Sequence, residues 1–577
     1  MNKHLPELDF SPESIPLRRS IWLIYFSAVL MAVVLLGQNP LLGAEGEVAE
    51  GIRSLLEKRD IFDTGNYRKP ELFSQLWLCR VQMLPAYLGG SSEFTWRLFS
   101  LIPALLLLGG TMMLANDFFD RQEMCCAGWM LIGSYGFIYW SRSCANFIFL
   151  AAWCIWTAVI LNRKRGSFFQ SMLLGCLIFS GSLWWGLNYI LTLPGVLVIT
   201  YPVWKEKFQL LRFSAALFAG AVISLVLSLL LIWQLELPVK ANIFRFFHLL
   251  KWTLFESYLV TVGIPFASFG GGKALLNLPR LLLPWTLPAF CTLYAMIRYR
   301  EDLSREQRYL LWGTGLLFLL TGVFPARRWQ YQLCQLPFFI VICAGGITGA
   351  LPEEEKLSHY ARLVMKWTAA LAGSVAASVF VIWPLWDVIF QTSMPLWIMI
   401  GVPAAGLTAL GFLIFDTGAT SAVEKNSGMN TRQSGWILAW VMLSAALMIG
   451  TSVLGQYRTE KNFWIKCGEI IRGDQQTRAL FFRGVPDGRA LCYMKVAAIP
   501  EMVENRQELQ EKLRIENAGE LLLILRRRNQ NELNEILENT GWLTEKNEPV
   551  LQEEGKIRFT GKNLRDDDFL LCRIKRK

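Results

Sequence analysis

Charged residues are scarce in this chain of 577 residues, at 18% of the sequence, whereas hydrophobic residues make up 53%. A soluble globular protein carries about 25% charged residues, so much of this surface faces something other than water. Apolar runs of about 20 residues, the length that crosses a bilayer as a helix, recur along the chain. They argue against a large soluble enzyme with an apolar core. The sequence therefore predicts an α-helical polytopic membrane protein.

Histidine is also scarce, and metal-binding patterns are missing. The three histidines are His4, His248 and His359. They are too widely spaced for a metal site. The 12 cysteines show no metal-ligand spacing, and most lie in apolar runs, where buried free thiols are expected. A disulfide between Cys467 and either Cys492 or Cys572 stays open if that region lies outside the cytoplasm.

The net charge of +11 comes from short basic clusters between the apolar runs, such as residues 162–165, 205–212 and 298–308. Clusters of Lys and Arg beside membrane helices are typical of cytoplasmic loops under the positive-inside rule. Membrane orientation thus accounts for the basic balance, and nucleic acid is not an expected partner.

The apolar runs predict about thirteen transmembrane helices. The run after Arg18-Arg19 is too long for a cleavable signal peptide, so it is expected to remain as the first helix. With a cytoplasmic N-terminus, the basic clusters fall on the cytoplasmic side nearly every time, and an odd number of spans puts the C-terminal end outside. The predicted spans are 21–37, 98–115, 125–141, 145–161, 170–185, 187–203, 213–233, 276–297, 309–324, 331–349, 367–390, 394–415 and 436–454.

Two regions depart from this pattern. Within a transmembrane domain of residues 1–454, the polar stretch 38–97 forms a large first outer loop, and residues 45–57 in it have the periodicity of an amphipathic helix. Residues 455–577 are typical of a soluble α/β domain, expected on the outer (periplasmic) face. The elements expected in that domain are strands at 490–493 and 520–525 and helices at 500–513 and 531–539.

Polar residues on the predicted outer side are the candidate site, because burying them near a membrane costs free energy that function usually justifies. The first loop, the third-to-fourth connection and the ninth-to-tenth connection contribute Glu45, Glu47, Lys69 and Arg97, then Arg142 and Asn146, then Arg327, Arg328 and Tyr331. Arginine and lysine suit a lipid-linked phosphate. The carboxylates suit a general base or a divalent-cation site. Taken singly, each residue is better explained as a solvated loop charge or an interface anchor.

The order of the motifs along the chain is a further indication of function. They are Ala44-Glu45-Gly46-Glu47 before the amphipathic helix, Tyr67-Arg68-Lys69-Pro70, Arg97-Leu98, Arg142 with Asn146, and Arg327-Arg328 with Tyr331 and Pro337. This order resembles that of the GT-C membrane glycosyltransferases. The branch it is most similar to contains the lipid A aminoarabinose transferases and the protein O-mannosyltransferases (the dolichyl-phosphate-mannose-protein mannosyltransferase superfamily).

The resemblance implies a glycosyltransferase of the plasma (inner) membrane, surrounded by membrane lipids. It would pass a sugar from a polyprenyl-phosphate donor to a lipid, glycan or protein acceptor at the outer face. Glu45 or Glu47 would deprotonate the acceptor. The donor phosphate would be held by Lys69, Arg68, Arg142, Arg327, Arg328 and Tyr331, supported by Arg97, Asn146 and His248. A divalent cation stays open as a cofactor.

Two positions depart from the family pattern. The family's first-loop Asp falls on Ala44, and its later Asp falls on Asn146. Neither residue can act as a base. Either Glu45 or Glu47 has taken over this role, or the chain is a catalytically degenerate protein that binds a lipid-linked sugar. A lipid or solute transporter is a third interpretation, but the chain shows no convincing internal repeat.

Overall fold

The structure is a computed structural model. It describes residues 14–33, 36, 41, 44–56, 72–145, 147–162, 168–185, 187–207, 214–215, 217–224, 226, 271–323, 329–348, 460–473, 478–483, 488–496, 500–503, 505–516, 519–544, 549–552 and 569–576. The predicted spans 367–390, 394–415 and 436–454 and part of the span 213–233 lie outside the described residues.

The chain divides into two compact units, each made of separate segments. Unit 1 consists of Met1–Val34, Lys69–Leu78 and Leu98–Gly450, and unit 2 of Leu35–Arg68, Cys79–Arg97 and Thr451–Lys577. The described parts of the first loop before Leu98 are thus grouped largely with the C-terminal segment. A domain boundary at 454/455 stays a prediction.

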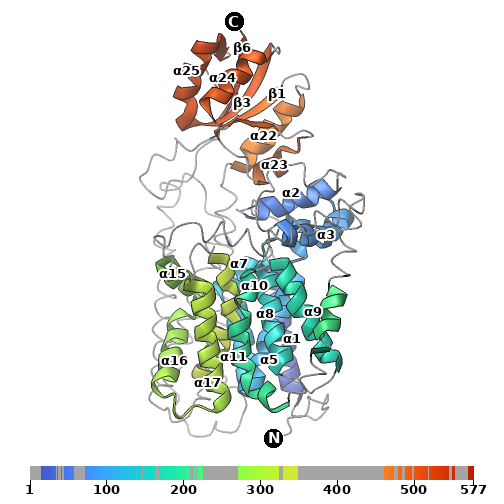
Figure 1. Ribbon diagram of the computed structural model, residues 1–577, viewed down its shortest axis with the longest axis vertical. Helices are drawn as coiled ribbons and strands as arrows, with labels where there is room; N and C mark the ends of the chain where they lie inside the picture. The colour runs from blue at the N-terminus through green and yellow to red at the C-terminus, as the bar shows by residue number, and fades with distance from the viewer. Residues whose placement is uncertain are drawn as a thin grey trace. The chain divides into compact units, whose positions relative to one another are not determined.

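Unit 1 is a bundle of helices (Figure 1). Its described elements are α1 (Ser14–Val33), α5 (Leu101–Phe118), α6 (Arg121–Ile132), α7 (Tyr135–Ser141), α8 (Phe147–Asn162), α9 (Phe168–Trp185), α10 (Leu187–Ile190), α11 (Leu193–Lys207), α15 (Gly271–Leu282), α16 (Thr286–Arg298), α17 (Arg305–Phe318), the π-helix η2 (Leu319–Val323), the 3-10 helix η3 (Trp329–Gln335) and α18 (Leu336–Thr348). Helix α5 packs against α6 and α8, and α11 packs against α8 and α17.

Small residues allow α11 and α17 to pack closely in the bundle. A side chain at Gly313 of α17 would collide with Ile199 of α11, and one at Gly195 of α11 would collide with Leu317 of α17. Glycines at facing positions let two helix backbones approach closely, which is how many membrane helices associate.

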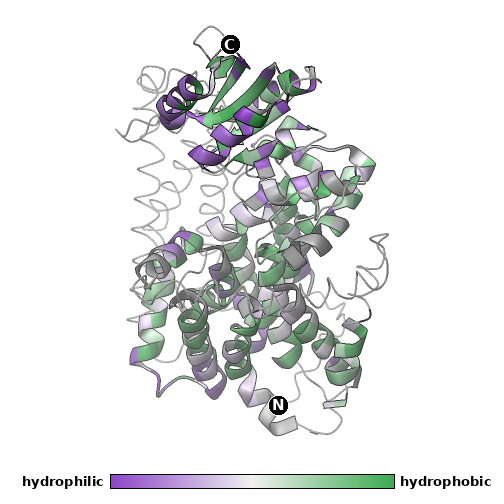
Figure 2. Ribbon diagram, turned by 45° about the horizontal axis from the view of Figure 1, so that its top comes forward, coloured by the Kyte–Doolittle hydropathy of each residue, from purple (hydrophilic) through white to green (hydrophobic). Residues whose placement is uncertain are grey.

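The outer faces of these helices carry large apolar side chains. Helix α1 exposes 75% of Trp22 and 64% of Phe26, and α17 exposes 60% of Trp312. Figure 2 shows the helices of unit 1 mostly in the colours of hydrophobic residues. Such surfaces are unfavourable in water and favourable against lipid, which suits a membrane-embedded bundle.

Among the described residues, one helical stretch is long and apolar enough to cross a membrane by length and composition. It runs from Glu93 to Phe118 and spans 26 residues. Four apolar helices are shorter, namely Phe147–Asn162, Phe169–Ser182, Leu193–Pro202 and Gln332–Gly346. The total of about thirteen spans stays a prediction.

Three predicted spans are each broken into two helices, so the prediction of one continuous helix was wrong for each of them. The span 187–203 breaks at residues 191–192, between α10 and α11. The span 125–141 breaks at Gly133 and Ser134, where the Ser134 hydroxyl caps α7 by accepting from the Phe137 N–H. The span 276–297 breaks after α15, where Pro284 disfavours helical backbone at the residue before it. The break near Ser134 and the break near Pro284 contact each other: the Tyr135 N–H donates a hydrogen bond to the Leu283 carbonyl at 2.7 Å.

The C-terminal part of unit 2 is a mixed sheet with helices on both faces. Its elements are α22 (Glu460–Gly473), β1 (Arg478–Phe482), α23 (Gly488–Met494), β2 (Glu501–Val503), α24 (Arg506–Ile515), β3 (Glu520–Arg526), α25 (Gln530–Thr540), β4 (Trp542–Thr544), β5 (Leu551–Gln552) and β6 (Phe569–Arg576). The strand order is β2-β1-β3-β6-β4, with β5 also paired to β6. Strand β1 is parallel to β2 and β3, and β6 is antiparallel to β3, β4 and β5.

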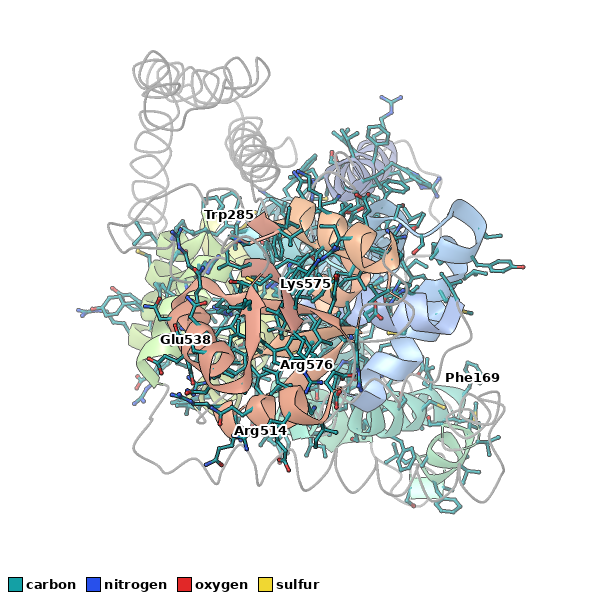
Figure 3. All side chains as sticks on the ribbon, turned by 90° about the horizontal axis from the view of Figure 1, so that it is seen from above. Phe169, Trp285, Arg514, Glu538, Lys575 and Arg576 are labelled. Carbon is teal, nitrogen blue, oxygen red and sulfur yellow. The ribbon has the colours of Figure 1, made fainter. Side chains whose placement is uncertain are left out.

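Strand β3 shows why both faces are covered, since residues 521–525 are all buried. Leu521, Leu523 and Leu525 pack in a core cluster with apolar residues of α24 and α25. On the part of the sheet near α22, Trp464 packs against the rings of Phe481 and Phe569. Charged residues cover the outside; Figure 3 labels Arg514, Glu538, Lys575 and Arg576.

The sequence predictions for this region were mixed. Strand 520–525 and the helices near 500–513 and 531–539 correspond to β3, α24 and α25, although α24 begins only at Arg506 and β2 occupies part of the predicted helix. The strand predicted at 490–493 was wrong, because these residues lie in α23. Helix α23 packs against α22 and against α2 (Ala44–Leu56), and its residues 490–494 are all apolar and buried, which removes the periodicity that separates a short helix from a strand.

A substitution at Gly541 tests the backbone conformation at the C-terminal end of α25. It ends α25 in the left-handed region at φ +72°, with open space around it. We expect Gly541→Ala to lower the free energy of unfolding by about 1 kcal/mol, because a Cβ is strained in this conformation. Gly473→Ala at the end of α22, also in open space but without positive φ, is the matched control and should be neutral or slightly stabilising. Pulse proteolysis in urea measures both; equal effects would contradict the assignment.

The cysteines in the C-terminal part of unit 2 are free thiols in the structure. Cys467, Cys492 and Cys572 are each at most 2% exposed and unpaired. Burial raises the pKa of Cys467 to about 12 and that of Cys572 to about 11, and it raises the pKa of Cys492 well above the ordinary value.

These pKa shifts predict unreactive thiols. At pH 8 in the folded protein we expect iodoacetamide to leave all three cysteines unmodified, because the thiolate is the reactive form. As the pH rises, labelling should increase first at Cys572, whose pKa is the lowest of the three. Peptide mass spectrometry with and without denaturant measures this, and a disulfide-linked peptide under non-reducing conditions would contradict it.

Candidate functional site

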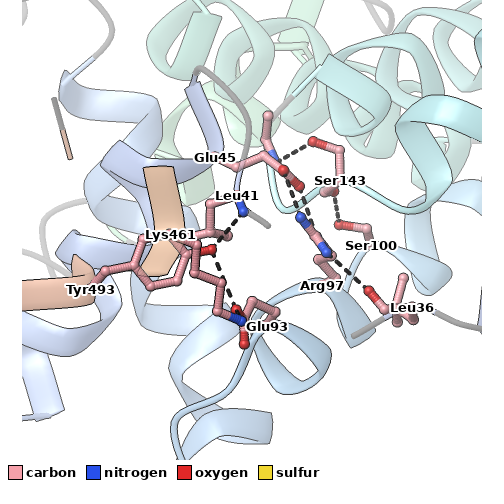
Figure 4. Close-up of polar contacts among 10 residues, drawn as sticks. Leu36, Leu41, Glu45, Glu93, Arg97, Ser100, Ser143, Lys461 and Tyr493 are labelled. Atoms are coloured by element: carbon pink, nitrogen blue, oxygen red, sulfur yellow. Dashed lines mark hydrogen bonds and ion pairs between the residues drawn. The ribbon is translucent and has the colours of Figure 1, made fainter. Parts of the chain in front are cut away.

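The first loop is organised around a buried ion pair. Glu45, at the start of α2, is 5% exposed, and Arg97, in α4 (Glu93–Leu98), is 2% exposed. The Arg97 Nε donates to Glu45 Oε1 at 3.0 Å and its Nη2 to Glu45 Oε2 at 2.8 Å. Both carboxylate oxygens are therefore bound by one guanidinium fork (Figure 4), the strongest geometry for this pair.

Arg97 also fixes the chain that leads into the loop. Its Nη1 donates to the carbonyl of Leu36 at 3.0 Å. A buried guanidinium must have its charge and its N–H donors satisfied, and Glu45 and Leu36 do so from two sides. Arg97 thereby ties the entry of the loop, the start of α2 and the end of the loop into one arrangement.

A second polar group lies one helical turn earlier on α4. The Glu93 carboxylate forms an ion pair with Lys461 of α22 and accepts a hydrogen bond from the Tyr493 hydroxyl at 3.3 Å. The same hydroxyl accepts from the Leu41 N–H at 2.7 Å. Figure 4 shows Lys461 and Tyr493 gathered at Glu93. Residues of α22 and α23 thus hold the first loop at both of its ends.

Tyr493 can fill this place because it stays protonated. Burial raises its pKa above the ordinary value. Since its oxygen accepts from Leu41, its single proton is directed to Glu93. The ammonium of Lys461 lies 5.5 Å from the Tyr493 ring centre and adds a cation–π contact.

Helix α2 is fitted closely to α23. Gly46 packs against the backbone and side chain of Arg489, and a Cβ there would collide with both. One turn further on, Glu50 and Arg53 form a buried bidentate pair, at 2.8 Å from Nε and 2.6 Å from Nη2. The Cys79 thiol of α3 (Leu72–Gly89) contacts the Val48 carbonyl at 3.5 Å. The predicted amphipathic helix is therefore present, and the small residue after Glu45 is sterically required.

In unit 1, Arg142 lies at the C-terminal end of α7 and is 8% exposed. Its Nη1 donates to the Met31 carbonyl of α1 at 3.1 Å. A cation beside the last carbonyls of a helix is favourably placed. The following loop is fixed as well, because the Ser100 hydroxyl donates to the Ser143 carbonyl at 2.5 Å.

The structure thus brings together Glu45 and Arg97 among the predicted site residues and places Arg142 at a helix end of unit 1. Glu47 lies in α2 and Tyr331 in η3, but their side chains are outside the described set. Arg68, Lys69, Asn146, His248, Arg327 and Arg328 also lie outside the described residues.

Sequence reasoning missed Glu93, Lys461 and Tyr493. Glu93 is 368 residues from Lys461 and 400 from Tyr493, and Leu41 is 452 residues from Tyr493. No local pattern encodes contacts of this separation. Within the described ranges, no group of three or more His, Cys, Asp or Glu side chains is arranged to hold a metal ion.

Comparison with solved structures shows which known folds the chain resembles over most of its length. ArnT from Cupriavidus metallidurans bound to undecaprenyl phosphate is 14% identical, with a TM-score of 0.64 over 96% of this chain and 97% of that chain. The chain is similar in fold to ArnT. The apo state of ArnT gives 14% identity and a TM-score of 0.63 over the same shares. ArnT is a lipid A aminoarabinose transferase of the GT-C class. The resemblance to GT-C membrane glycosyltransferases expected from the sequence is thereby confirmed for the fold, a helical polytopic membrane fold.

A more distant likeness is to the archaeal oligosaccharyltransferase AglB from Archaeoglobus fulgidus, in complex with an inhibitory peptide and a dolichol-phosphate. It is 11% identical, with a TM-score of 0.43 over 88% of this chain and 69% of that chain. No protein-family model matches the chain, and no curated protein matches its sequence.

The Glu45–Arg97 pair can be tested by its effect on stability. We expect Arg97→Ala to destabilise the protein by about 3–5 kcal/mol, because it leaves the Glu45 carboxylate buried and uncompensated. Arg506→Ala, which removes an exposed ion pair to Glu535, is the matched control and should change little. Urea unfolding of the two variants in the same detergent measures the difference. Equal, small losses would show that the Glu45–Arg97 pair is not a buried constraint.

Proposed function

We propose that this protein is an integral membrane glycosyltransferase that moves a sugar from a polyprenyl-phosphate donor to a lipid, glycan or protein acceptor. The observation that carries the proposal is the ArnT-like fold over nearly the whole chain, combined with a first loop whose α2 is held by the buried Glu45–Arg97 pair. The ArnT structure contains undecaprenyl phosphate, and a donor of this class is proposed here by that likeness.

In the proposed reaction an acceptor hydroxyl attacks the anomeric carbon of the sugar. The new bond joins the acceptor oxygen to this carbon, the bond from the carbon to the phosphate oxygen breaks, and the polyprenyl phosphate leaves with the electron pair. The acceptor proton passes to a carboxylate base. A single displacement of this kind inverts the configuration at the sugar.

Of the two candidate bases, Glu47 is favoured. Both oxygens of Glu45 accept hydrogen bonds from Arg97, and the residue is 5% exposed, so its carboxylate would have to leave Arg97 to meet an acceptor hydroxyl. Glu47 lies two positions further along α2, about 200° around the helix axis, and is proposed as the base in place of Glu45. Glu45 then acts by fixing the start of α2.

Basic residues are proposed to stabilise the leaving phosphate, where negative charge develops in the transition state. They are Lys69, Arg68, Arg142, Arg327 and Arg328, with Tyr331, Asn146 and His248 in support. The first-loop and C-terminal regions are proposed to lie on the outer face of the inner membrane, with the N-terminus in the cytoplasm. A divalent cation is retained as a possible addition to be tested by a chelator.

A second candidate function is that of a catalytically degenerate protein that binds a lipid-linked sugar. Ala44 and Asn146 favour it, since both replace the acids of the family pattern, and so does the engagement of Glu45 by Arg97. It predicts donor binding without transfer.

The deciding assay is transfer of labelled sugar from undecaprenyl-phosphate donors by the purified protein. We expect Glu47→Gln to lower kcat by about 10²–10⁴-fold with donor binding retained, as for loss of a general base. Lys69→Ala should weaken donor binding, and Glu538→Gln, on the exposed surface of α25, is the control. Added EDTA tests the divalent cation. Donor binding without transfer to any acceptor would contradict the enzyme and support the degenerate binding protein.

A further inference from the structure

A set of buried polar side chains lies around the turn from α17 into α18 in unit 1. Thr314, Thr321, Gln332 and Gln335 are 0%, 1%, 3% and 0% exposed. Thr314 and Thr321 lie about two helical turns apart on the stretch formed by α17 and the π-helix η2. Gln332 and Gln335 lie three residues apart in the 3-10 helix η3, where such residues project from the same side.

One hydrogen-bond chain fixes the orientation of Gln335. The Thr321 hydroxyl donates its only proton to the Leu317 carbonyl at 2.7 Å. The contact of 2.5 Å between Thr321 and Gln335 must therefore be donated by the amide Nε2 of Gln335. The carbonyl oxygen of Gln335 is then left without a hydrogen-bond partner within the described part of the chain.

Three polar atoms of this set have no hydrogen-bond partner among the described residues. They are Gln335 Oε1, Gln332 Oε1 and Thr314 Oγ1. A buried polar group without a partner is costly, and native proteins keep such groups satisfied except where a ligand or water completes them. Polar groups among apolar membrane helices, and π-helical turns inside α-helices, both occur preferentially at functional sites.

The set lies at a defined place in the bundle. Helix α15 packs against η2, η3 and α7, and Arg142 lies at the C-terminal end of α7. In Figure 1, α7 and α15 are at the same end of the helical bundle. The unpartnered atoms are therefore near the end of unit 1 that carries Arg142, and they follow Arg327 and Arg328 closely in the chain.

We propose that Gln332, Gln335 and Thr314 bind the hydroxyl or amino groups of the sugar carried by the donor. The inference rests on the proposed function for the nature of the donor. The chemistry of the open atoms selects the sugar rather than the phosphate: the two amide oxygens accept hydrogen bonds, so the ligand must donate them. A phosphodiester at neutral pH has no proton to donate, whereas every sugar hydroxyl has one.

The test compares binding of two kinds of lipid, with and without a sugar, to the full-length protein in detergent. The probes are undecaprenyl phosphate carrying glucose, mannose or aminoarabinose, and bare undecaprenyl phosphate. We expect Gln335→Leu, Gln332→Leu and Thr314→Val to weaken binding of at least one sugar-carrying lipid by about 10-fold or more, and to leave binding of the bare lipid unchanged.

Stability provides a second readout. Thr314→Val removes a buried polar atom without a described partner, so we expect its midpoint of unfolding to stay the same or rise. Gln335→Leu also removes the hydrogen bond to Thr321, so we expect a lower midpoint for that variant. Thr111→Val is the matched control: Thr111 is equally buried but donates to the Leu107 carbonyl of its own helix α5. If Gln335→Leu fails to fold, Thr314→Val, which keeps the side-chain shape, still decides the matter.

The outcomes separate this inference from the proposed function. If wild type transfers sugar and all three variants bind the sugar-carrying lipids as wild type does, the sugar site is overturned while the transferase stands. If wild type transfers nothing but binds a sugar-carrying lipid more tightly than the bare lipid, and the variants abolish that difference, the sugar site stands without the transferase. If the variants bind the sugar-carrying lipids and the bare lipid equally more weakly than wild type does, the sugar site is overturned, since such a loss indicates a general disturbance of the bundle.

Discussion

The buried pair of Glu45 and Arg97 is the constraint on which the arrangement of the first loop depends. Two opposite charges removed from water are tolerable only when each satisfies the other and the spare donors find acceptors. Here the fork of Arg97 takes both oxygens of Glu45, and its third contact is the Leu36 carbonyl. The start of α2 can therefore hardly move without exposing a charge to an apolar surrounding, and the position of Glu47 on α2 follows from that of Glu45.

The C-terminal segment contributes to the same constraint from within unit 2. It has no recognisable catalytic motif, and its sheet is an ordinary packed core. Two of its side chains, Lys461 and Tyr493, nevertheless bind Glu93, and Tyr493 also binds Leu41. Its described contacts with the first loop are therefore structural: they hold Leu41 and Glu93 in place.

Much of the fold could be predicted from the sequence because it depends on local patterns of apolar and polar residues. Apolar runs mark helices such as α5 and α8, the periodicity of residues 45–57 marks α2, and the apolar run at 520–525 marks β3. What failed depended on contacts outside the local window. The breaks at Gly133 and at Pro284 interrupt apolar runs without changing their hydropathy, and α23 lost its helical pattern because both of its sides are buried.

The candidate site was predictable in part for the same reason. Glu45 and Arg97 stood out as charges in a loop of a membrane protein, but nothing in the sequence indicated that they pair directly with each other. Tyr493 gave no signal at all. A tyrosine in an apolar stretch is ordinary, and only the fold brings it to Leu41 and Glu93.

The distance along the chain between Leu41 and Tyr493 has a consequence for biogenesis. A protein is made from its N-terminus, and segments fold as they emerge. Arg97 can meet Glu45 as soon as the first hundred residues are in place, whereas the anchors at Leu41 and Glu93 wait until residues 461 and 493 have been synthesised. The first loop is thus synthesised early, but its contacts with Lys461 and Tyr493 form only after most of the chain has been made. In an incomplete chain the loop has the Glu45–Arg97 pair and lacks these later contacts.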